Sequence, residues 1–553
     1  MNFTDDTVGS LLEKWAAETP DNKFITYPKH SLDLTFREFN ERVDLFAKGL
    51  MQMGVTKDTK VGIWANNVPD WLTVFFATAK LGAWLVTINT NYKLAELEYI
   101  MHNADIHTLC IIHGYRDSDY VNMLYKIAPE LKRCYRGKLK CEKLKYLRNI
   151  ILLEEESYEG IYRTSEVLEF GRQADEQKYE QMKASIGSYD IVNMQYTSGT
   201  TGFPKGVMLS HHNIINNAFD TGEILNYTPE DRLLLCLPMF HCFGIVLGVL
   251  GILTHGASLV ITEDFDPLNV LKAIEKERCT ALYGVPTMFV AELNHADFDK
   301  FDLTSLRTGI MAGSVCPIET LNAVMTRMNM KDVIVVYGLT ETSPGVTASR
   351  PSDAPEKRST TIGTEYPNVE VKIFDHDTGR ECAIGEAGEI CCRGYNVMRG
   401  YYKNPKATRL AIDRRGWFHS GDLAMKDADG FYHMTGRIKD LIIRGGENIY
   451  PREIENFIYQ MQPVQMVEIV GVPDAKYGEI VVAFIILKEG YQLTQEKVQE
   501  YCRGQISRYK IPKYVFFVDD YPKTGSGKVQ KFKLRELGKQ MVDEILANEP
   551  PKS

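Results

Sequence analysis

The sequence has no apolar run long enough to span a membrane. Its longest strongly apolar stretch, FGIVLGVLGIL from Phe243, has about half of the ~20 residues that a transmembrane helix needs. The first residues, MNFTDDTVGSLLEKW, also lack the basic and apolar segments of a secretory signal. We therefore expect a cytoplasmic protein without stable membrane insertion.

Excess positive charge and patterned cysteines are also missing. The chain has 64 Lys and Arg against 73 Asp and Glu, a net charge of −9, which argues against a dedicated nucleic-acid partner. Its 11 Cys are irregularly spaced and include no CxxC pair, so reduced thiols are favoured over disulfides or a zinc site. The adjacent Cys391 and Cys392 are predicted to be small core residues of a strand.

What the sequence does contain is the composition and rhythm of a large α/β protein. With 553 residues, 44% apolar and 25% charged, the chain is long enough for at least two domains. Short apolar runs at 61–67, 84–90 and 109–114 are predicted to be strands, with a helix at 72–83 between the first two. This βαβ order predicts parallel sheets covered by helices.

Two further segments concern the organisation of the chain. Residues 132–148 hold eight basic residues and one acidic residue, which indicates a solvated surface insertion or, alternatively, a patch that attracts an anion. Near residue 436, strands punctuated by Gly and Pro give way to a compact alternation of helix and strand. We therefore expect domains at 1–436 and 437–543, followed by a flexible tail at 544–553.

The stretch YTSGTTGFPKG from Tyr196 concentrates small hydroxyls and glycines before one lysine. Backbone N–H groups of a Gly-rich turn can converge on one anion, while hydroxyls add donors and Lys205 adds positive charge. A Walker A loop is excluded, because Lys205 follows Pro204 and precedes Gly206. We interpret the stretch as a phosphate cradle rather than a mobile surface turn. The predicted phosphate-binding residues are Thr197, Ser198, Gly199, Thr200, Thr201, Gly202, Phe203, Pro204 and Lys205.

This stretch looks like the signature of the adenylate-forming superfamily, which includes acyl-CoA synthetases, luciferases and the adenylation domains of peptide synthetases. Five further motifs follow in that family's order: PMFHCFG (238–244), YGLTETSP (337–344), HSGDLA (419–424), GRIKDLIIRGGENIYPREIE (436–455) and PKTGSGKVQK (522–531). The resemblance implies an α/β fold: a large N-terminal domain of stacked βαβ sheets with a small β-barrel-like part, and a small mobile α+β C-terminal domain. It also implies an ATP-dependent enzyme that makes acyl-AMP and pyrophosphate and then transfers the acyl group to a thiol.

The resemblance implies roles for residues around the phosphates and the adenine of ATP. Lys528, which alone would be a solvated loop lysine, is expected to bridge the substrate carboxylate and the α-phosphate. Glu341 is expected to bind Mg²⁺ and Thr340 to touch the α-phosphate, because charge that grows there needs cations and donors. Without the resemblance, Thr340 and Glu341 would be interpreted as a helix-capping pair, and Tyr337 would be interpreted as a core residue. The adenine site is expected to include Gly313, Ser314, Tyr337 and Gly338.

The same resemblance implies which residues bind the ribose of ATP, which residue is the hinge, and which residues contact the thiol substrate. Asp422 is expected to accept hydrogen bonds from both ribose hydroxyls, with Arg437 beside it, although an Asp after Gly is commonly a turn residue. Lys439 occupies the hinge position, where backbone rotation would turn the C-terminal domain between the two half-reactions. The Gly-Gly segment that follows is similar to that of acyl- and aryl-CoA synthetases, which favours CoA as the acceptor. The residues expected to contact CoA are Arg444, Gly445 and Gly446.

The identity of the acid is the weakest of these predictions. PMFHCFG has no Asp to hold an α-amino group and no carrier-site GGxS follows, so an acid without an amino group is favoured. His241 is expected at the aromatic gate beside the carboxylate, unless it is a core histidine. Gly244, Gly248 and Gly251 would share one helical face and leave a groove for an alkyl chain, or else allow close helix packing.

We therefore expect an AMP-forming fatty acid–CoA ligase for a medium- or long-chain acid, with ATP, Mg²⁺ and CoA. An aryl- or alicyclic-acid CoA ligase is the alternative within the family, and a luciferase is disfavoured. The alternative of another class is a non-catalytic nucleotide-binding scaffold or sensor. Lys205, Glu341, Asp422 and Lys528 argue against it, because a chain freed from catalysis has no chemical need for all four. The sequence leaves monomer and homodimer open.

Overall fold

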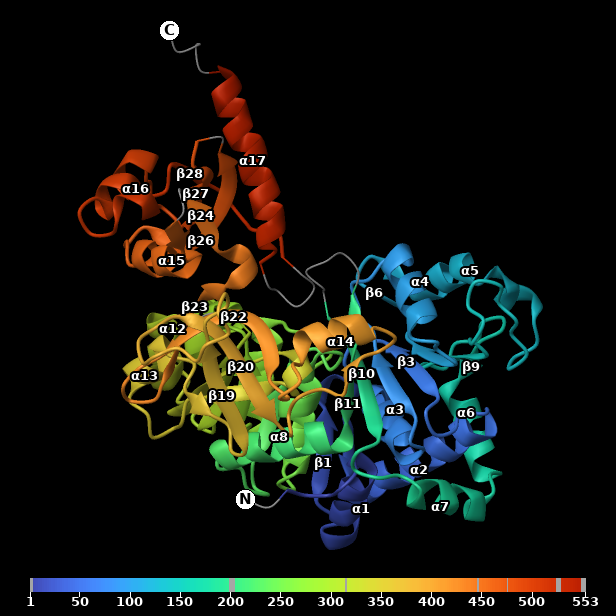
Figure 1. Ribbon diagram of the computed structural model, residues 1–553. Helices are drawn as coiled ribbons and strands as arrows, with labels where there is room; N and C mark the ends of the chain where they lie inside the picture. The colour runs from blue at the N-terminus through green and yellow to red at the C-terminus, as the bar shows by residue number, and fades with distance from the viewer. Residues whose placement is uncertain are drawn as a thin grey trace. The chain divides into compact units, whose positions relative to one another are not determined.

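The computed structural model of the chain describes residues 3–197, 204–313, 316–444, 447–474, 476–523 and 529–548. The chain folds as two compact units (Figure 1). The larger unit consists of Met1–Glu370 and Cys392–Phe418, and the smaller unit of Val371–Cys391 and His419–Ser553. A large N-terminal part and a smaller C-terminal part are thus present, as the sequence predicts.

The larger unit contains a nine-stranded sheet of order β18-β17-β16-β15-β14-β12-β13-β1-β2. The six strands from β16 to β1 in this order are parallel, and the strands at both edges pair antiparallel. The strands are β1 (Lys23–Tyr27), β2 (Leu32–Thr35), β12 (Arg232–Leu235), β13 (Ser258–Ile261), β14 (Ala281–Gly284), β15 (Thr308–Ala312), β16 (Asp332–Gly338), β17 (Gly345–Ala348) and β18 (Thr364–Glu365).

A second sheet of eight strands has the order β21-β11-β10-β4-β3-β5-β8-β9. The βαβ prediction is confirmed, because β3 pairs in parallel with both β4 and β5, and helix α3 (Pro69–Lys80) connects β3 to β4. The strands are β3 (Lys60–Trp64), β4 (Trp84–Thr87), β5 (Thr108–Ile111), β8 (Asn149–Leu152), β9 (Tyr162–Arg163), β10 (Ile191–Thr197), β11 (Lys205–Ser210) and β21 (Gly400–Tyr401).

The helices of this unit follow from apolar spacing and caps. Helix α2 (Phe36–Gln52) begins at a capping box of Thr35 and Glu38, and it buries apolar residues at intervals of three and four, among them Phe39, Val43 and Phe46. Helix α3 is buried on nearly all sides. Further helices are α1 (Val8–Glu18), α8 (His211–Ile224), α10 (Pro267–Glu277), α11 (Pro286–Leu293) and α12 (Ile318–Arg327).

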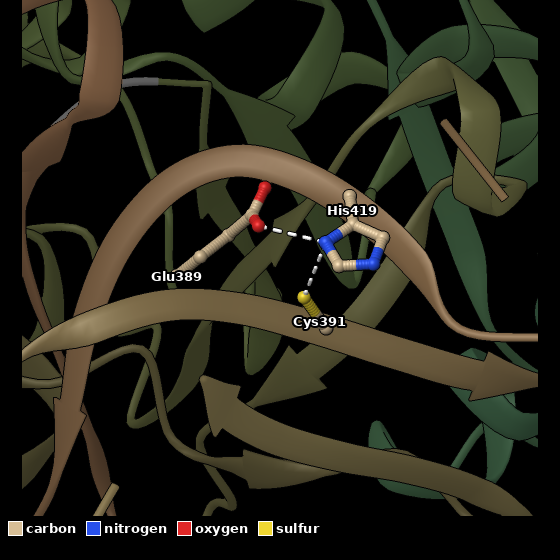
Figure 2. Close-up of side chains that lie close together, drawn as sticks. All are labelled: Glu389, Cys391 and His419. Atoms are coloured by element: carbon tan, nitrogen blue, oxygen red, sulfur yellow. Dashed lines mark hydrogen bonds and ion pairs between the residues drawn. The ribbon is translucent and has the colours of Figure 1, made fainter. Parts of the chain in front are cut away.

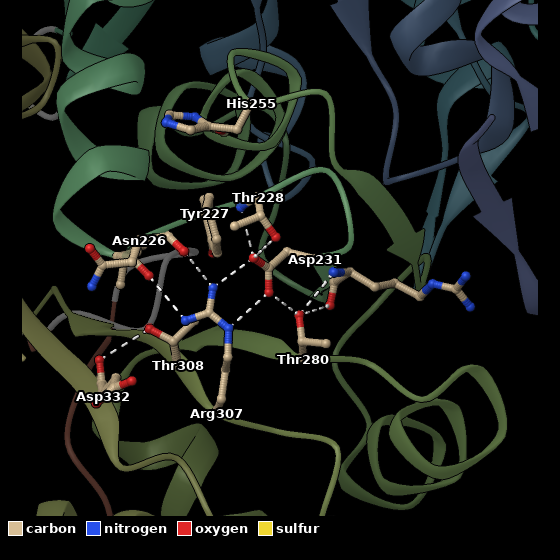
Figure 3. Close-up of polar contacts among 12 residues, drawn as sticks. Asn226, Tyr227, Thr228, Asp231, His255, Thr280, Arg307, Thr308 and Asp332 are labelled. Atoms are coloured by element: carbon tan, nitrogen blue, oxygen red, sulfur yellow. Dashed lines mark hydrogen bonds and ion pairs between the residues drawn. The ribbon is translucent and has the colours of Figure 1, made fainter. Parts of the chain in front are cut away.

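A polar network joins the amino ends of three parallel strands (Figure 3). Asp231 precedes β12, Thr280 precedes β14 and Arg307 precedes β15. The Asp231 carboxylate accepts hydrogen bonds from Arg307 Nε (3.0 Å), Arg307 Nη2 (2.6 Å) and Thr280 Oγ1 (2.7 Å). Burial alone would raise the pKa of Asp231, but the hydrogen bonds and charge of Arg307 hold that pKa below its usual range. Through the Asp231–Arg307 contact, the network holds together the amino ends of β12 and β15, although these two residues are 76 positions apart in the chain.

The apolar run from Phe243 is a π-helix, η3 (Phe243–Leu250), which packs against α8 and β12. The predicted glycine groove is therefore not formed as expected. An added Cβ would lie 2.5 Å from Pro238 O at Gly244 and 2.9 Å from Leu235 Cδ1 at Gly248. Because hydrogen bonds from i to i+5 change the period of the helix, residues spaced for one α-helical face are no longer aligned. Gly244 and Gly248 thus serve close packing, which was the alternative, whereas a Cβ at Gly251 would make only an ordinary contact, 3.7 Å from Ala218 O.

The smaller unit contains a four-stranded sheet, of order β19-β20-β22-β23, and a five-stranded α+β part. The first is a small β part of the kind predicted, but it belongs to the smaller unit, whereas the resemblance places it in the large N-terminal domain. Its strands are β19 (Val369–Phe374), β20 (Gly388–Gly394), β22 (Phe418–Lys426) and β23 (Tyr432–Arg437). The strands of the second are β24 (Ile442–Arg444), β25 (Glu447–Ile449), β26 (Val464–Asp474), β27 (Gly478–Leu487) and β28 (Tyr514–Phe517).

The five-stranded part has a core on each face of its sheet. One core includes Ile454 and Ile458 of α15 (Pro451–Tyr459) and Val498 of α16 (Gln495–Cys502). The other includes Leu534 and Val542 of α17 (Lys531–Asn548). Successive residues of β26 alternate between the two cores, since side chains of a strand point to opposite faces in turn.

Three expectations about the chain as a whole can be compared with the structure. All 11 cysteines are free, and the predicted core residues Cys391 and Cys392 are buried in β20. Most basic side chains of 132–148 are exposed, while Leu139, Leu144 and Leu147 are buried, so the segment lies at the surface and both interpretations of its charge stay predictions. Within the described ranges, no helix combines the length and the apolar character needed to cross a bilayer.

Candidate functional site

The predicted site residues of the larger unit lie where parallel strands of the nine-stranded sheet end. Gly313 directly follows β15, Tyr337 and Gly338 end β16, and His241 lies in the segment after β12. Strands β15 and β16 are parallel neighbours, with Ala312 paired to Val336, so their exits lie side by side. In open α/β sheets this carboxyl edge is where ligands bind.

Two glycines at this edge have geometric reasons to be glycine. A Cβ on Gly338 would lie 1.7 Å from Pro344 O, a distance that no side chain can occupy. Gly313 has φ +87°, in the left-handed region that favours glycine, and it is exposed. The backbone thus turns sharply after β15, and at the end of β16 it packs directly against Pro344, so both positions require glycine.

A buried carboxylate lies directly after β16. Glu341, in the short helix η5 (Thr340–Thr342), is 9% exposed, and its Oε1 accepts a hydrogen bond from Tyr401 Oη at 2.8 Å. Lys205 Nζ lies 4.4 Å from the centre of the Tyr401 ring. Burial and the charge of Glu341 raise the pKa of Tyr401, so the phenol stays a proton donor. The aromatic ring thus lies between a carboxylate and a lysine that the sequence had assigned to ATP.

Tyr401 and Cys242 are site residues that the sequence analysis missed. Cys242 Sγ lies 3.7 Å from both Thr340 Oγ1 and His241 Nδ1, so it connects two predicted residues. The backbone N–H of Phe243 donates to His241 Nδ1 at 3.2 Å, which orients the imidazole. The signals were weak: Cys242 is one apolar-looking residue of PMFHCFG, and Tyr401 follows a glycine in a short strand. His241 and Thr340 are half-buried and close together, as the prediction requires.

The hairpin of β10 and β11 supports the predicted phosphate cradle. Thr197 and Lys205 are paired across the two strands, and Tyr99 Oη donates to Pro204 O at 3.1 Å. The remaining predicted cradle residues, Ser198–Phe203, lie outside the described residues, and so do four other predicted residues. These four are Ser314, Gly445, Gly446 and Lys528.

The smaller unit brings Asp422 and Arg437 together. They are paired across β22 and β23, and Arg437 Nε lies 2.9 Å from Asp422 Oδ1. The Asp422 side chain is 5% exposed and that of Arg437 is 47% exposed. Arg437 thus offers an accessible guanidinium while it orients a carboxylate that can accept hydrogen bonds from hydroxyls.

Lys439 and Arg444 follow in the same unit. Burial and the nearby charge of Arg437 lower the pKa of Lys439, whose backbone carbonyl accepts a hydrogen bond from Arg535 of α17 at 3.4 Å. Arg444 Nη1 donates to Tyr509 O at 2.5 Å, and its guanidinium lies 5.2 Å from the centre of the Tyr477 ring. The Arg444 side chain is thus held on its own unit by a backbone carbonyl and an aromatic ring.

The groups in the two units match the chemistry of nucleotide-dependent acid activation. Carboxylate oxygens such as those of Glu341 are ligands that Mg²⁺ prefers, so this residue fits a magnesium ion. Lys205 adds a positive charge next to Tyr401. The Asp422 carboxylate, paired with Arg437, carries oxygens that can accept hydrogen bonds from hydroxyl groups.

Comparison with known proteins places the chain in a family. The profile of the AMP-binding enzymes matches residues 12–402, and that of the AMP-binding enzyme C-terminal domain matches residues 453–528. The chain belongs to the AMP-binding enzyme family. It is an ATP-dependent, adenylate-forming acid–CoA ligase, that is, an acyl-CoA synthetase.

Relatives and a solved structure agree with this assignment. YngI of Bacillus subtilis (strain 168), by its name an acyl-CoA synthetase, is 49% identical over 537 residues, which cover 97% of this chain and 98% of YngI. The human mitochondrial medium-chain acyl-CoA ligase ACSF2 is 40% identical, over 97% of this chain and 88% of its own. The crystal structure of ATP-bound MatB from Rhodopseudomonas palustris is 27% identical with a TM-score of 0.84, over 97% of this chain and 100% of MatB.

Proposed function

We propose that this acyl-CoA synthetase activates medium- or long-chain fatty acids. The observation that carries the proposal is the 40% identity, over 97% of the chain, to a ligase named for medium-chain acids. Apolar residues follow β12 and β14 in the chain and are proposed to border the alkyl chain; they are Val246, Leu247 and Leu250 of η3 and Met288 and Phe289 of α11. An apolar wall favours an alkyl chain by about 0.8 kcal/mol for each methylene that it buries.

We propose that the larger unit carries out most of the phosphate chemistry. The substrate carboxylate attacks the α-phosphorus of ATP, the bond to the β-phosphate oxygen breaks, and acyl-AMP and pyrophosphate form. Lys205 and the 197–205 cradle would hold the phosphates, Thr340 would donate to the α-phosphate, and Tyr337 would lie against the adenine. Mg²⁺, when held by Glu341, supplies positive charge that neutralises the phosphates. His241, close to Thr340, is proposed to border the carboxylate of the acid.

The smaller unit is proposed to bind the ribose and to serve both half-reactions. Asp422 would accept the ribose hydroxyls, with Arg437 beside it, and Lys528 would bridge the carboxylate and the α-phosphate during adenylation. Rotation at Lys439 would then bring Arg444, Gly445 and Gly446 to CoA, whose thiol attacks the acyl carbon and releases AMP.

The division at 436/437, the mobility of the C-terminal domain and the tail at 544–553 remain predictions. A monomer or homodimer in the cytoplasm also remains a proposal.

An aryl- or alicyclic-acid ligase is the alternative within the family. The observation in its favour is the close packing at Gly244 and Gly248, which removes the expected glycine groove as an argument for a long alkyl chain. A non-catalytic scaffold has less support, because relatives that match nearly the whole chain are named as an acyl-CoA synthetase and an acyl-CoA ligase.

The test is to measure pyrophosphate and AMP with and without CoA. The acids would be the saturated series from acetate to palmitate, together with benzoate, phenylacetate and cyclohexanecarboxylate. We expect CoA-dependent AMP formation with a maximum of kcat/KM at medium or long alkyl chains. A maximum at ring acids would keep the mechanism and overturn the proposed substrate, and absence of turnover with every acid, despite ATP binding, would favour the scaffold.

A further inference from the structure

Three side chains of different chemistry converge in the small four-stranded sheet (Figure 2). Glu389 and Cys391 lie two residues apart on β20, so both point to the same face, and His419 lies on the neighbouring strand β22. A carboxylate oxygen, the Cys391 sulfur and a ring nitrogen all lie within 4.8 Å of one another. This is the one group of three or more metal-ligating side chains found within the described ranges.

The distances fit the ligand shell of a zinc ion. Cys391 Sγ lies 3.4 Å from His419 Nδ1, and Glu389 Oε2 lies 2.7 Å from the same nitrogen. Tetrahedral zinc with ordinary bond lengths separates sulfur and nitrogen by about 3.5 Å, and nitrogen and oxygen by about 3.4 Å. The sulfur and the nitrogen are therefore already in place, and the carboxylate would have to move by about 0.7 Å when the ion replaces its hydrogen bond with the imidazole.

The surroundings of the group allow it to hold an ion and to exchange it. Glu389 and Cys391 are buried, and the other carboxylate oxygen, Glu389 Oε1, accepts a hydrogen bond from the backbone N–H of Gly421 at 2.9 Å. Such outer contacts orient ligands in metal sites. The His419 side chain is 32% exposed, which gives an entry path and a place for a water ligand.

We propose that Glu389, Cys391 and His419 form a reversible zinc-binding site, separate from the magnesium expected at Glu341. Binding would release the thiol proton of Cys391 to solvent and would use the lone pair of His419 Nδ1, which leaves the ring proton on Nε2. Three protein ligands with a fourth position open to water are typical of zinc sites that keep an open coordination position rather than of closed structural sites. Cysteine spacing could not predict the site, because it takes one cysteine, from a strand, and no CxxC pair.

Co²⁺ is the probe, because a thiolate bound to cobalt gives a charge-transfer band in the near ultraviolet. The full chain, reduced, treated with chelator and free of ATP, would be titrated with Co²⁺ and then with Zn²⁺. We expect a band that saturates at one equivalent and disappears when Zn²⁺ displaces the cobalt. We also expect the melting temperature to rise by a few degrees with excess Zn²⁺.

The neighbouring cysteine supplies the matched control. Cys392 is equally buried but points to the opposite face of β20, so Cys392→Ser should keep the band while Cys391→Ser loses it. His419→Gln should weaken Co²⁺ binding at least tenfold, and its exposed ring makes it the safer variant should Cys391→Ser fail to fold. The proposal is overturned if the wild type binds no Co²⁺ at one equivalent, or if His419→Gln or a folded Cys391→Ser binds it like the wild type.

Discussion

The two edges of the nine-stranded sheet use polar residues in opposite ways. At the amino edge, the Asp231 carboxylate accepts hydrogen bonds from Arg307, Thr280 and the backbone N–H of Thr228, and its side chain is 3% exposed. At the carboxyl edge, Thr340 and His241 are half-buried and reach each other through a single thiol. The same sheet therefore has a closed structural network at one edge and half-buried polar side chains at the other.

Glu341 lies at the carboxyl edge but is buried like Asp231. Its substitution therefore tests whether a buried carboxylate at this edge serves activity rather than stability. We expect Glu341→Gln to lower the rate of pyrophosphate release by about 100-fold, or roughly 3 kcal/mol, because a neutral amide is a poor ligand for Mg²⁺. The melting temperature should change little, since the amide oxygen can still accept from Tyr401. Glu319→Gln, at an exposed position of α12, is the control and should keep the wild-type rate. If Glu341→Gln releases pyrophosphate at the wild-type rate, Glu341 is not a ligand of Mg²⁺.

Asp231→Asn is the corresponding change at the amino edge. Because it weakens hydrogen bonds between charged groups, we expect a loss of about 2 kcal/mol in stability, seen as a melting temperature a few degrees lower, with kcat/KM unchanged. The pKa of Asp231 is lowered in the folded state, so its stabilisation is complete above the ordinary pKa of about 3.9 and is lost as the pH falls through the folded value. The difference in melting temperature between variant and wild type should therefore narrow below about pH 4. A lower kcat/KM at an unchanged melting temperature would contradict the separation of the two edges.

The sequence predicted the carboxyl edge better than the amino edge. Motifs such as YGLTETSP and PMFHCFG are local, so each points to residues near the end of β16 or after β12. In the second sheet, the alternation of apolar runs predicted β3, α3, β4 and β5. The Asp231–Arg307 contact joins residues 76 positions apart, and no local pattern marks it. The π-helix η3 was missed because a continuous apolar run shows no polar periodicity from which its hydrogen-bond spacing could be inferred. Tyr401 was missed for the reason that applies to the Asp231–Arg307 contact: its partner Glu341 is 60 residues away in the sequence.

Tyr401 gives the smallest of the expected effects and shows how the carboxyl edge is supported. Tyr401→Phe removes the hydrogen bond to Glu341 but keeps the ring beneath Lys205, so the carboxylate loses its orientation and the lysine keeps its neighbour. Loss of a residue that orients a metal ligand typically costs 10- to 100-fold in metal affinity or activity. We expect about a tenfold higher Mg²⁺ concentration for half-maximal pyrophosphate release.

The adjacent residue provides the control for this experiment. Tyr402 Oη donates to Asp105 Oδ2 at 2.9 Å, so Tyr402→Phe removes the same hydroxyl from the next residue without touching Glu341. Its Mg²⁺ dependence should match that of the wild type. If both variants shift the Mg²⁺ dependence equally, the effect belongs to the stability of this segment, and Tyr401 has no separate role in positioning Glu341.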